Sequence, residues 1–254
     1  MKLSAVLCIH NEQDRLPGCL AKLEFADEIV IVLDRCTDRS KSIAIEHDAV
    51  IVEGVFPLEG DRRNAGIETA AGDWILELDA DEIVPEALAT EIVATIDESD
   101  ADYHAIPFDN YVGQRLVKYG WGASFGVSSV VRLTRNGVKS WGFERVHPKI
   151  TLKGTRGEPL HKAIIHHVDR DLTDMIRRLN SYSSARAADL REAWLKKEKL
   201  ETLRHNLLRF FGRFYKCFVR RKGYREGLMG FAIALMAGLY PILSYLKAHL
   251  DRDD

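Results

Sequence analysis

Gly72-Asp-Trp-Ile-Leu-Glu-Leu-Asp-Ala-Asp-Glu82 is the stretch from which both the fold and the chemistry of this chain can be inferred. Residues 74–78 form a run of large apolar side chains that only Glu77 interrupts, which predicts a buried strand. Asp79, Asp81 and Glu82 follow at its carboxyl end. In a strand or its extension, Asp79 and Asp81 point the same way because side chains alternate with period two. Such a pair is typical of a site for Mg²⁺ or Mn²⁺ held jointly with a phosphate, and a polar turn is the plain alternative.

Strands and helices alternate through the first hundred residues. Apolar runs at residues 4–9, 28–33, 50–53 and 74–78 predict strands, and helices are expected at about residues 14–22, 40–46 and 61–69. Nearly all-apolar strands joined by helices indicate an α/β fold with a mainly parallel sheet covered on both faces. Ligands bind such sheets at the carboxyl ends of the strands, where His10-Asn11-Glu12, Asp34 and the Asp79/Asp81 pair fall. We therefore expect one binding cleft at this edge.

Composition and motifs exclude several classes of protein. The 254 residues suffice for one large domain with an appendage, and 46% hydrophobic and 29% charged residues describe a folded protein. No G-x-G-x-x-G follows the first strand and no G-x-x-x-x-G-K-[ST] occurs, which argues against Rossmann dehydrogenases and P-loop enzymes. The four cysteines show no C-x-x-C spacing, and a strand is predicted directly after Met1-Lys2. We expect reduced thiols, no signal peptide and a cytoplasmic location.

The chain becomes basic and helical from about residue 169. Segment 202–225 contains no acidic residue and eight basic ones among leucines and aromatics, namely Arg204, Arg209, Arg213, Lys216, Arg220, Arg221, Lys222 and Arg225. A basic, aromatic-rich amphipathic helix is typical of binding to an anionic membrane surface, here through residues 202–250. Nucleic acid would suit the charge, but no nucleic-acid-binding module accompanies it.

Segment 228–246 carries no charge and is barely long enough to span a bilayer. Gly230, Gly238, Pro241 and Ser244 weaken the case for a spanning helix. We expect a helix that lies in the membrane interface or packs in a hairpin with the preceding helix. A spanning helix and a helix buried against the preceding domain are the alternatives.

Several motifs taken in series resemble those of one enzyme family. Residues 4–12, Asp34-Arg-Cys-Thr-Asp38, Asp61-Arg-Arg-Asn64 and the stretch 72–82 together resemble the family 2 inverting glycosyltransferases of the GT-A fold. Four motifs later in the chain are similar to those of a bacterial branch that includes lipopolysaccharide-core β-glucosyltransferases. These motifs are Trp121, Val146-His147, Ile165-His166 and Asn180-Ser-Tyr-Ser183. The resemblance implies a GT-A domain over residues 1–168, with a nucleotide-sugar half (about 1–100) and an acceptor half (about 101–168). A helical, membrane-associating tail (169–254) would follow.

The resemblance also implies roles for individual residues. Asp34 would accept a hydrogen bond from a uracil ring, and the segment Ile9, Asn11 and Glu12 would close over the nucleoside. Arg63 would lie near the phosphates, Asp79 near the ribose or a metal-bound water, and Asp81 would be a catalytic metal ligand. Some GT-A enzymes add a histidine to the metal site, so His166 is a candidate ligand, with a structural role as the alternative.

Inversion requires a base that accepts the proton of the acceptor hydroxyl. The related branch commonly has Val-His-Glu where this chain has Val146-His147-Pro148, so that carboxylate is missing. Glu144 is the first candidate for the base, and His147 and Asp109 are the next candidates. Glu144 could instead pair with Arg145 or Lys149. Aromatic residues between 109 and 160 could stack on sugar rings or form a second small core.

The expected activity is transfer of a hexose, glucose in the first instance, from a uridine diphosphate (UDP) sugar with the help of Mg²⁺ or Mn²⁺. The expected acceptor is a lipid-linked or lipopolysaccharide-core saccharide, and the expected location is the cytoplasmic face of the inner membrane. A sugar-phosphate nucleotidyltransferase and a non-catalytic membrane adaptor with a GT-A fold are the alternatives.

Overall fold

The computed structural model describes residues 1–122, 127–144, 148–196 and 201–251. They form two compact units. The sheet unit comprises Met1–Phe108 and Ser129–His166, and the helical unit comprises Asp109–Ser128 and His167–Asp254. Segment 109–128, which the sequence placed in the acceptor half, groups with the C-terminal helices.

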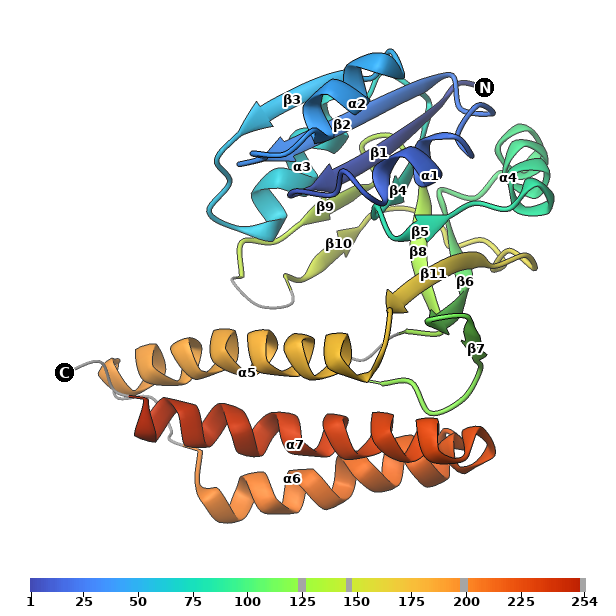
Figure 1. The fold of residues 1–254 in the computed structure, drawn as a ribbon. Coiled ribbons are helices and arrows are strands. Elements are labelled where there is room, and N and C mark those ends of the chain that lie inside the picture. The colour runs from blue at the N-terminus through green and yellow to red at the C-terminus, as the bar shows by residue number, and fades with distance from the viewer. Residues whose placement is uncertain (123–126, 145–147, 197–200, 252–254) are drawn as a thin grey trace. The chain divides into compact units, whose positions relative to one another are not determined.

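The first half of the sheet unit is a parallel sheet with helical connections (Figure 1). Its strands lie in the order β3-β2-β1-β4, and each pair of neighbours is parallel. The strands are β1 (Leu3–Ile9), β2 (Glu28–Asp34), β3 (Val50–Gly54) and β4 (Trp74–Leu78), and the helices between them are α1 (Leu16–Leu20), α2 (Ser40–Glu46) and α3 (Glu59–Thr69). The alternation expected from the apolar runs is confirmed, and the carboxyl ends of β1, β2 and β4 meet at one edge.

The second half of the sheet adds antiparallel strands. β8 (Ser129–Arg135) pairs with β4 and with β6 (Tyr103–Val112), and β11 (Ile164–Asp169) pairs with the short β5 (Glu82–Ile83). The remaining elements are α4 (Glu86–Glu98), β7 (Arg115–Val117), which pairs with β6, and the hairpin of β9 (Lys139–Trp141) and β10 (Ile150–Leu152). These long-range pairings bring β8 and β11 beside the end of β4.

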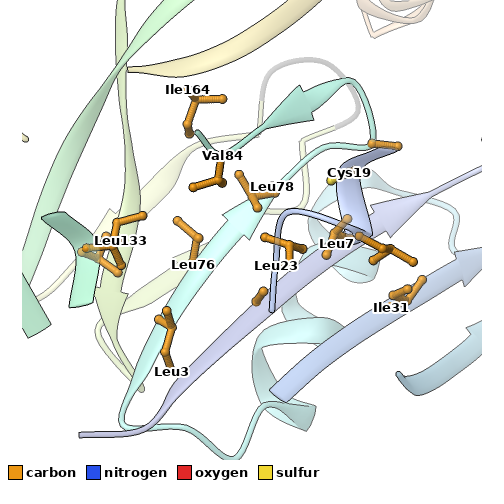
Figure 2. Packing of buried hydrophobic residues seen from close by; sticks show 14 of the residues in the cluster. Leu3, Leu7, Cys19, Leu23, Ile31, Leu76, Leu78, Val84, Leu133 and Ile164 are labelled. Carbon is orange, nitrogen blue, oxygen red and sulfur yellow. The ribbon is translucent and has the colours of Figure 1, made fainter. Parts of the chain in front are cut away.

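The two faces of the sheet bury different side chains. Leu7 and Leu76 lie on one face with Leu23, beside α1 (Figure 2). Val6 and Ile75 point to the opposite face, which α3 covers. A Cβ at Gly66 of α3 would lie 2.6 Å from Val6 Cγ1, so the helix approaches β1 as closely as glycine permits. Because side chains alternate along β4, Glu77 belongs to this second face.

The helical unit is built around α7 (Leu228–Leu250), which packs against both α5 (Leu172–Leu195) and α6 (Leu203–Tyr215) (Figure 1). Asp171 caps α5 through Asp174 N–H, and Thr202 caps α6 through His205 N–H. A π-helical turn (Lys216–Arg220) and a 3-10 turn (Gly223–Glu226) connect α6 to α7. The core of the unit joins Met175 and Leu179 of α5 to Ile233, Ala237 and Tyr240 of α7.

In the described part of the chain, α7 alone is long and apolar enough to cross a membrane. Half of the most apolar 18-residue stretch of this helix is nevertheless buried within the protein. A Cβ at Gly238 would lie 2.9 Å from Phe210 Cδ2, so α6 and α7 touch closely. The structure therefore shows α7 packed in a hairpin with α6, which is one of the two arrangements expected for this segment.

Candidate functional site

The acidic stretch after β4 forms a tight turn. Glu82 N–H donates to Asp79 O at 3.0 Å, and Asp79 N–H donates to Glu82 Oε2 at 3.0 Å. β4 ends at Leu78, so Asp79 and Asp81 do not continue an extended strand and the expected alternation does not apply to them. The turn instead gives each carboxylate its own set of partners.

Asp79 lies between two buried arginines. Arg63 Nη2 donates to its Oδ1 at 3.1 Å, and Arg132 Nη2 donates to its Oδ2 at 2.8 Å. Burial would raise the pKa of Asp79, but the two guanidinium groups outweigh this effect and hold the pKa well below its usual range. Asp79 is therefore ionised at neutral pH and keeps both arginines in place.

Arg132 is a site residue that the sequence analysis missed. It interrupts the apolar run of β8, is only 7% exposed and contacts Glu82 as well as Asp79. The antiparallel register pairs Leu133 with Leu76, which places Arg132 near the end of β4. The sequence feature that could have identified Arg132 is a charged residue within a largely apolar strand.

Glu82 is almost fully buried, with 1% of its surface exposed. Its Oε1 accepts a hydrogen bond from Arg132, and its Oε2 accepts the Asp79 N–H. Burial raises the pKa of Glu82 to about 7, although the nearby Arg132 acts in the opposite direction. Glu82 thus closes the turn and orients its neighbours.

Asp81 directly precedes β5 and lies close to His166 of the neighbouring strand β11. The register pairs His166 with Glu82, and His166 Nε2 lies 3.7 Å from Asp81 Oδ2. Burial would lower the pKa of His166, but the nearby carboxylate of Asp81 and the charges of Glu82 and Asp79 raise it above its ordinary value. Arg15 Nη1 lies 3.8 Å from the same carboxylate oxygen.

Among the described residues, Asp81, Glu82 and His166 form a group that could hold a divalent cation, since one ligand atom of each lies within 4.8 Å of the others. Glu82 already uses both oxygens for Arg132 and Asp79 N–H. Asp81 and His166 are the two that would supply ligands, one carboxylate oxygen and one imidazole nitrogen.

Asp34 ends β2 at the same edge of the sheet and is 2% exposed. Arg35 forms a bidentate ion pair with Asp34, in which Nε donates to Oδ1 at 2.9 Å and Nη2 donates to Oδ2 at 2.8 Å. Phe56 N–H also donates to Asp34 Oδ1, at 3.1 Å. Burial would raise the pKa of Asp34, but these hydrogen bonds lower it. The Arg35 side chain is 55% exposed, whereas that of Asp34 is 3% exposed.

The loops after β1 and β2 are joined by hydrogen bonds. Asn11 adopts a left-handed φ of 56° and accepts Thr37 N–H at 2.8 Å, while Glu12 N–H donates to Ser40 Oγ at 3.0 Å. Ile9 is the last residue of β1 and its carbonyl accepts the Cys36 thiol at 3.6 Å. Burial raises the pKa of the Glu12 carboxyl, which also lies 3.8 Å from Arg15. The residues expected around a nucleoside thus form one connected loop pair.

Glu144 follows β9 on the β9–β10 hairpin. Its Oε2 accepts Lys149 N–H at 3.0 Å, and this hydrogen bond holds the pKa of Glu144 below its ordinary value. Lys149 Nζ also lies 3.8 Å from Glu144 Oε1, so the pairing with Lys149 that the sequence left as an alternative is present. His147 lies outside the described residues, and Asp109 belongs to the helical unit.

Aromatic residues of the middle segment have different surroundings. Trp121 is 6% exposed and part of the core of the helical unit, whereas Trp141 packs against the α3 face of the sheet. Phe143 is 71% exposed. For Trp121 and Trp141 the structure shows core packing.

Comparisons with known proteins agree with this architecture. The model of the family "Glycosyl transferase family 2" matches residues 4–136, more than half of the chain. The lipopolysaccharide core biosynthesis glycosyltransferase LpsC of Rhizobium meliloti (strain 1021) is 26% identical over 265 residues, which cover 98% of this chain and 92% of that protein. A TPR repeat-containing protein of Synechococcus elongatus is 32% identical over 102 residues, and the match covers 39% of this chain but only 25% of that protein.

Solved structures show the same fold. The S. aureus TarS 1-349 structure has a TM-score of 0.50 and 16% identity, covering 98% of this chain and 87% of that chain. TarS 1-349 in complex with UDP has a TM-score of 0.51 and 14% identity, covering 97% and 91%. The α/β architecture is that of the GT-A enzymes. With the family match spanning β1 to β8 and all of the strand-end acids, this chain belongs to glycosyl transferase family 2.

Proposed function

We propose that this protein transfers a hexose, glucose in the first instance, from a UDP-sugar to a lipid-linked or lipopolysaccharide-core saccharide with inversion at the anomeric carbon. The observation that carries the proposal is the edge of the sheet where Asp34 ends β2 and where Asp79 and Asp81 follow β4. Arg63, Arg132 and His166 lie around the Asp79/Asp81 acids. Similarity to LpsC supports the acceptor class, and the shared fold with UDP-bound TarS supports the donor nucleotide.

Different parts of this edge would bind the nucleoside and the phosphates of the donor. The joined loops of Ile9, Asn11 and Glu12 would enclose the nucleoside, and Asp34 would accept the uracil N–H after Arg35 moves aside. Arg63, held by Glu59 and Asp79, would present positive charge to the phosphates. Asp79 would face the ribose.

Departure of the diphosphate is assisted by the acidic turn. Asp81 and His166 would hold Mg²⁺ or Mn²⁺, which when bound neutralises negative charge on the leaving group. Arg15, 3.8 Å from Asp81, adds a second positive charge beside it.

The base that accepts the acceptor proton is proposed to be Glu144. Its low pKa makes it a modest base, and its hydrogen bond to Lys149 N–H must break or be shared during the reaction. Glu144→Gln is expected to lower kcat for transfer by about 100-fold or more while UDP affinity stays unchanged, because general base catalysis contributes this much. Single-turnover kinetics and a UDP titration measure the two quantities, and an unchanged kcat would remove Glu144 from the mechanism.

The activity is tested with purified protein, a set of UDP-hexoses, Mn²⁺ and a core oligosaccharide acceptor. We expect a product whose new glycosidic proton has, by NMR, the anomeric configuration opposite to that of the donor. A product with retained configuration would refute the inverting mechanism. Pyrophosphate release from a nucleoside triphosphate without glycoside formation would favour nucleotidyl transfer instead.

We further propose that α6 lies on the cytoplasmic face of an anionic inner membrane. Its exposed apolar residues repeat at helical spacing, with Leu207, Leu208, Phe211 and Tyr215 between 43% and 66% exposed. Exposed basic residues accompany them, namely Arg204, Lys216, Arg220, Arg221 and Lys222. An apolar stripe beside basic side chains matches the chemistry of an anionic lipid surface.

Flotation with phosphatidylglycerol-containing vesicles tests this surface. The L208E/F211E variant is expected to lose most vesicle binding, because two of the most exposed apolar contacts become charged. The matched control is I45E/V93E, in which the replaced side chains are 58% and 38% exposed on the sheet unit. Wild-type protein and the control should float with the vesicles, and equal recovery of L208E/F211E would contradict membrane docking through α6.

A further inference from the structure

Trp141 lies between Arg63 and a buried ion pair of the sheet. The Arg63 guanidinium carbon is 4.7 Å from the centroid of the indole ring. The indole Nε1–H donates to Glu77 Oε1 at 2.8 Å, and Glu77 forms an ion pair with Lys139. Lys139 Nζ is also 4.7 Å from the ring centroid. One tryptophan therefore contacts three charged groups.

The backbone of Trp141 is fixed to α3 by the residue that follows Arg63. Asn64 Oδ1 accepts Trp141 N–H at 2.9 Å, and Asn64 Nδ2 donates to Trp141 O at 2.9 Å. A Cβ at Gly60 would lie 1.9 Å from the carbonyl oxygen of Gly142, so the end of β9 is pressed against the first turn of α3. The ring consequently has a fixed position relative to Arg63.

Stability alone does not account for the ion pair. Glu77 and Lys139 are only 2% and 4% exposed, and Glu77 interrupts an otherwise apolar strand. Replacing a buried ion pair by apolar residues of similar volume is often neutral or stabilising. What the pair supplies here is an acceptor for the indole N–H, which fixes the plane of the ring.

Arg63 in turn connects the tryptophan to the reacting edge. Its Nη2 donates to Asp79, its Nε donates to Glu59 at 2.9 Å, and the flat face of its guanidinium group is left for Trp141. We propose that Trp141, held by Glu77 and Asn64, is a positioning residue that fixes Arg63 and, through Arg63, Asp79 for binding of the nucleoside diphosphate. The proposal rests on the proposed function of the same site.

A double-mutant cycle between Trp141 and Arg63 tests the proposal, with the dissociation constant of UDP measured by calorimetry in the presence of Mn²⁺. W141F is expected to weaken UDP binding about tenfold, because the N–H to Glu77 is lost and the ring can tilt. In an R63K background, the same W141F change should have no further effect, since lysine has no planar group to stack. Independent, multiplicative effects of the two changes would overturn the proposal.

A second variant separates positioning from stability. E77M/K139M removes the buried charges together, so its thermal unfolding should stay within a few degrees of wild type. Its UDP binding should nevertheless weaken about as much as that of W141F, and unchanged binding would overturn the proposal.

The matched control is W74F. Trp74 sits at the opposite end of β4, with Arg135 4.8 Å from its ring centroid and its N–H bonded to Met1 Sδ. W74F should leave UDP binding unchanged, and a tenfold loss there would show that any tryptophan–arginine pair of this sheet has the same effect.

Wild-type protein that binds no UDP at all would refute the proposed function itself.

Discussion

Replacing Asp81 by asparagine is expected to lower hexose transfer by about 100- to 1,000-fold without unfolding the protein. The amide has the shape of the carboxylate but carries no charge opposite His166 Nε2 and Arg15 Nη1, which lie 3.7 and 3.8 Å from Asp81 Oδ2. Loss of a single preorganised electrostatic contact at a developing charge has this magnitude. The measurement is kcat/KM for transfer at saturating Mn²⁺, together with thermal unfolding.

Asp73→Asn is the control for this substitution. Asp73 precedes β4 and accepts Lys2 N–H at 2.8 Å, at the end of the strand away from the acidic turn. Its replacement should leave kcat/KM within about twofold of wild type. Full transfer by Asp81→Asn, or wild-type transfer unaffected by removal of divalent ions, would contradict the assigned role of Asp81.

Arg132→Met should lower the free energy of unfolding by about 3–5 kcal/mol, the cost of leaving a buried charge without its partner. Arg132 contacts both Glu82 and Asp79. Once Arg132 is removed, Glu82 keeps only the Asp79 N–H as a donor among the contacts found in the described residues. Denaturant unfolding measures the change. Arg135→Met, on the same strand but bonded to the carbonyls of Ser99 and Ala101, is the control and should cost less.

The effect of Arg132→Met should depend on pH in a defined direction. The pKa of Glu82 is raised from 4.5 to about 7 in the folded protein, so folding favours the protonated form of this carboxyl. Its contribution to stability is fully present below about pH 4.5 and is lost as the pH rises through 7. Without Arg132 the pKa of Glu82 rises further, and the destabilisation should be larger at pH 8 than at pH 5. Equal losses at the two pH values would show that Glu82 is not coupled to Arg132.

The local pattern of the sequence was enough to predict the parallel half of the sheet. The apolar runs that became β1, β2 and β4 each end in polar residues, and chain topology requires those ends to share an edge. The position of Asp34, Asp79 and Asp81 at this edge of the sheet could therefore be predicted from the strand pattern alone. Only the conformation of the acidic turn differed, because Glu82 N–H bonds Asp79 O and ends the extended backbone.

The other half of the site depends on long-range register, which no local pattern encodes. Arg132 reaches Asp79 because β8 pairs antiparallel with β4, and the position of His166 follows from its pairing with Glu82 across β5 and β11. Trp141 is seen to contact Arg63 only once the β9–β10 hairpin is placed on α3. For Glu144, sequence alone could not decide between a base and a hairpin contact, and the structure shows the hydrogen bond to Lys149 N–H.

The central claim is that the acids at the carboxyl ends of β2 and β4 form one metal-assisted site for a nucleoside diphosphate. Calorimetric titration of UDP into wild-type protein, with Mn²⁺ and then with excess EDTA, tests it. We predict binding of one UDP per chain that is strong with Mn²⁺, at least tenfold weaker in EDTA, and equally weak for Asp81→Asn under both conditions. UDP binding of equal strength with Mn²⁺ and with EDTA, or no binding in either, would contradict it.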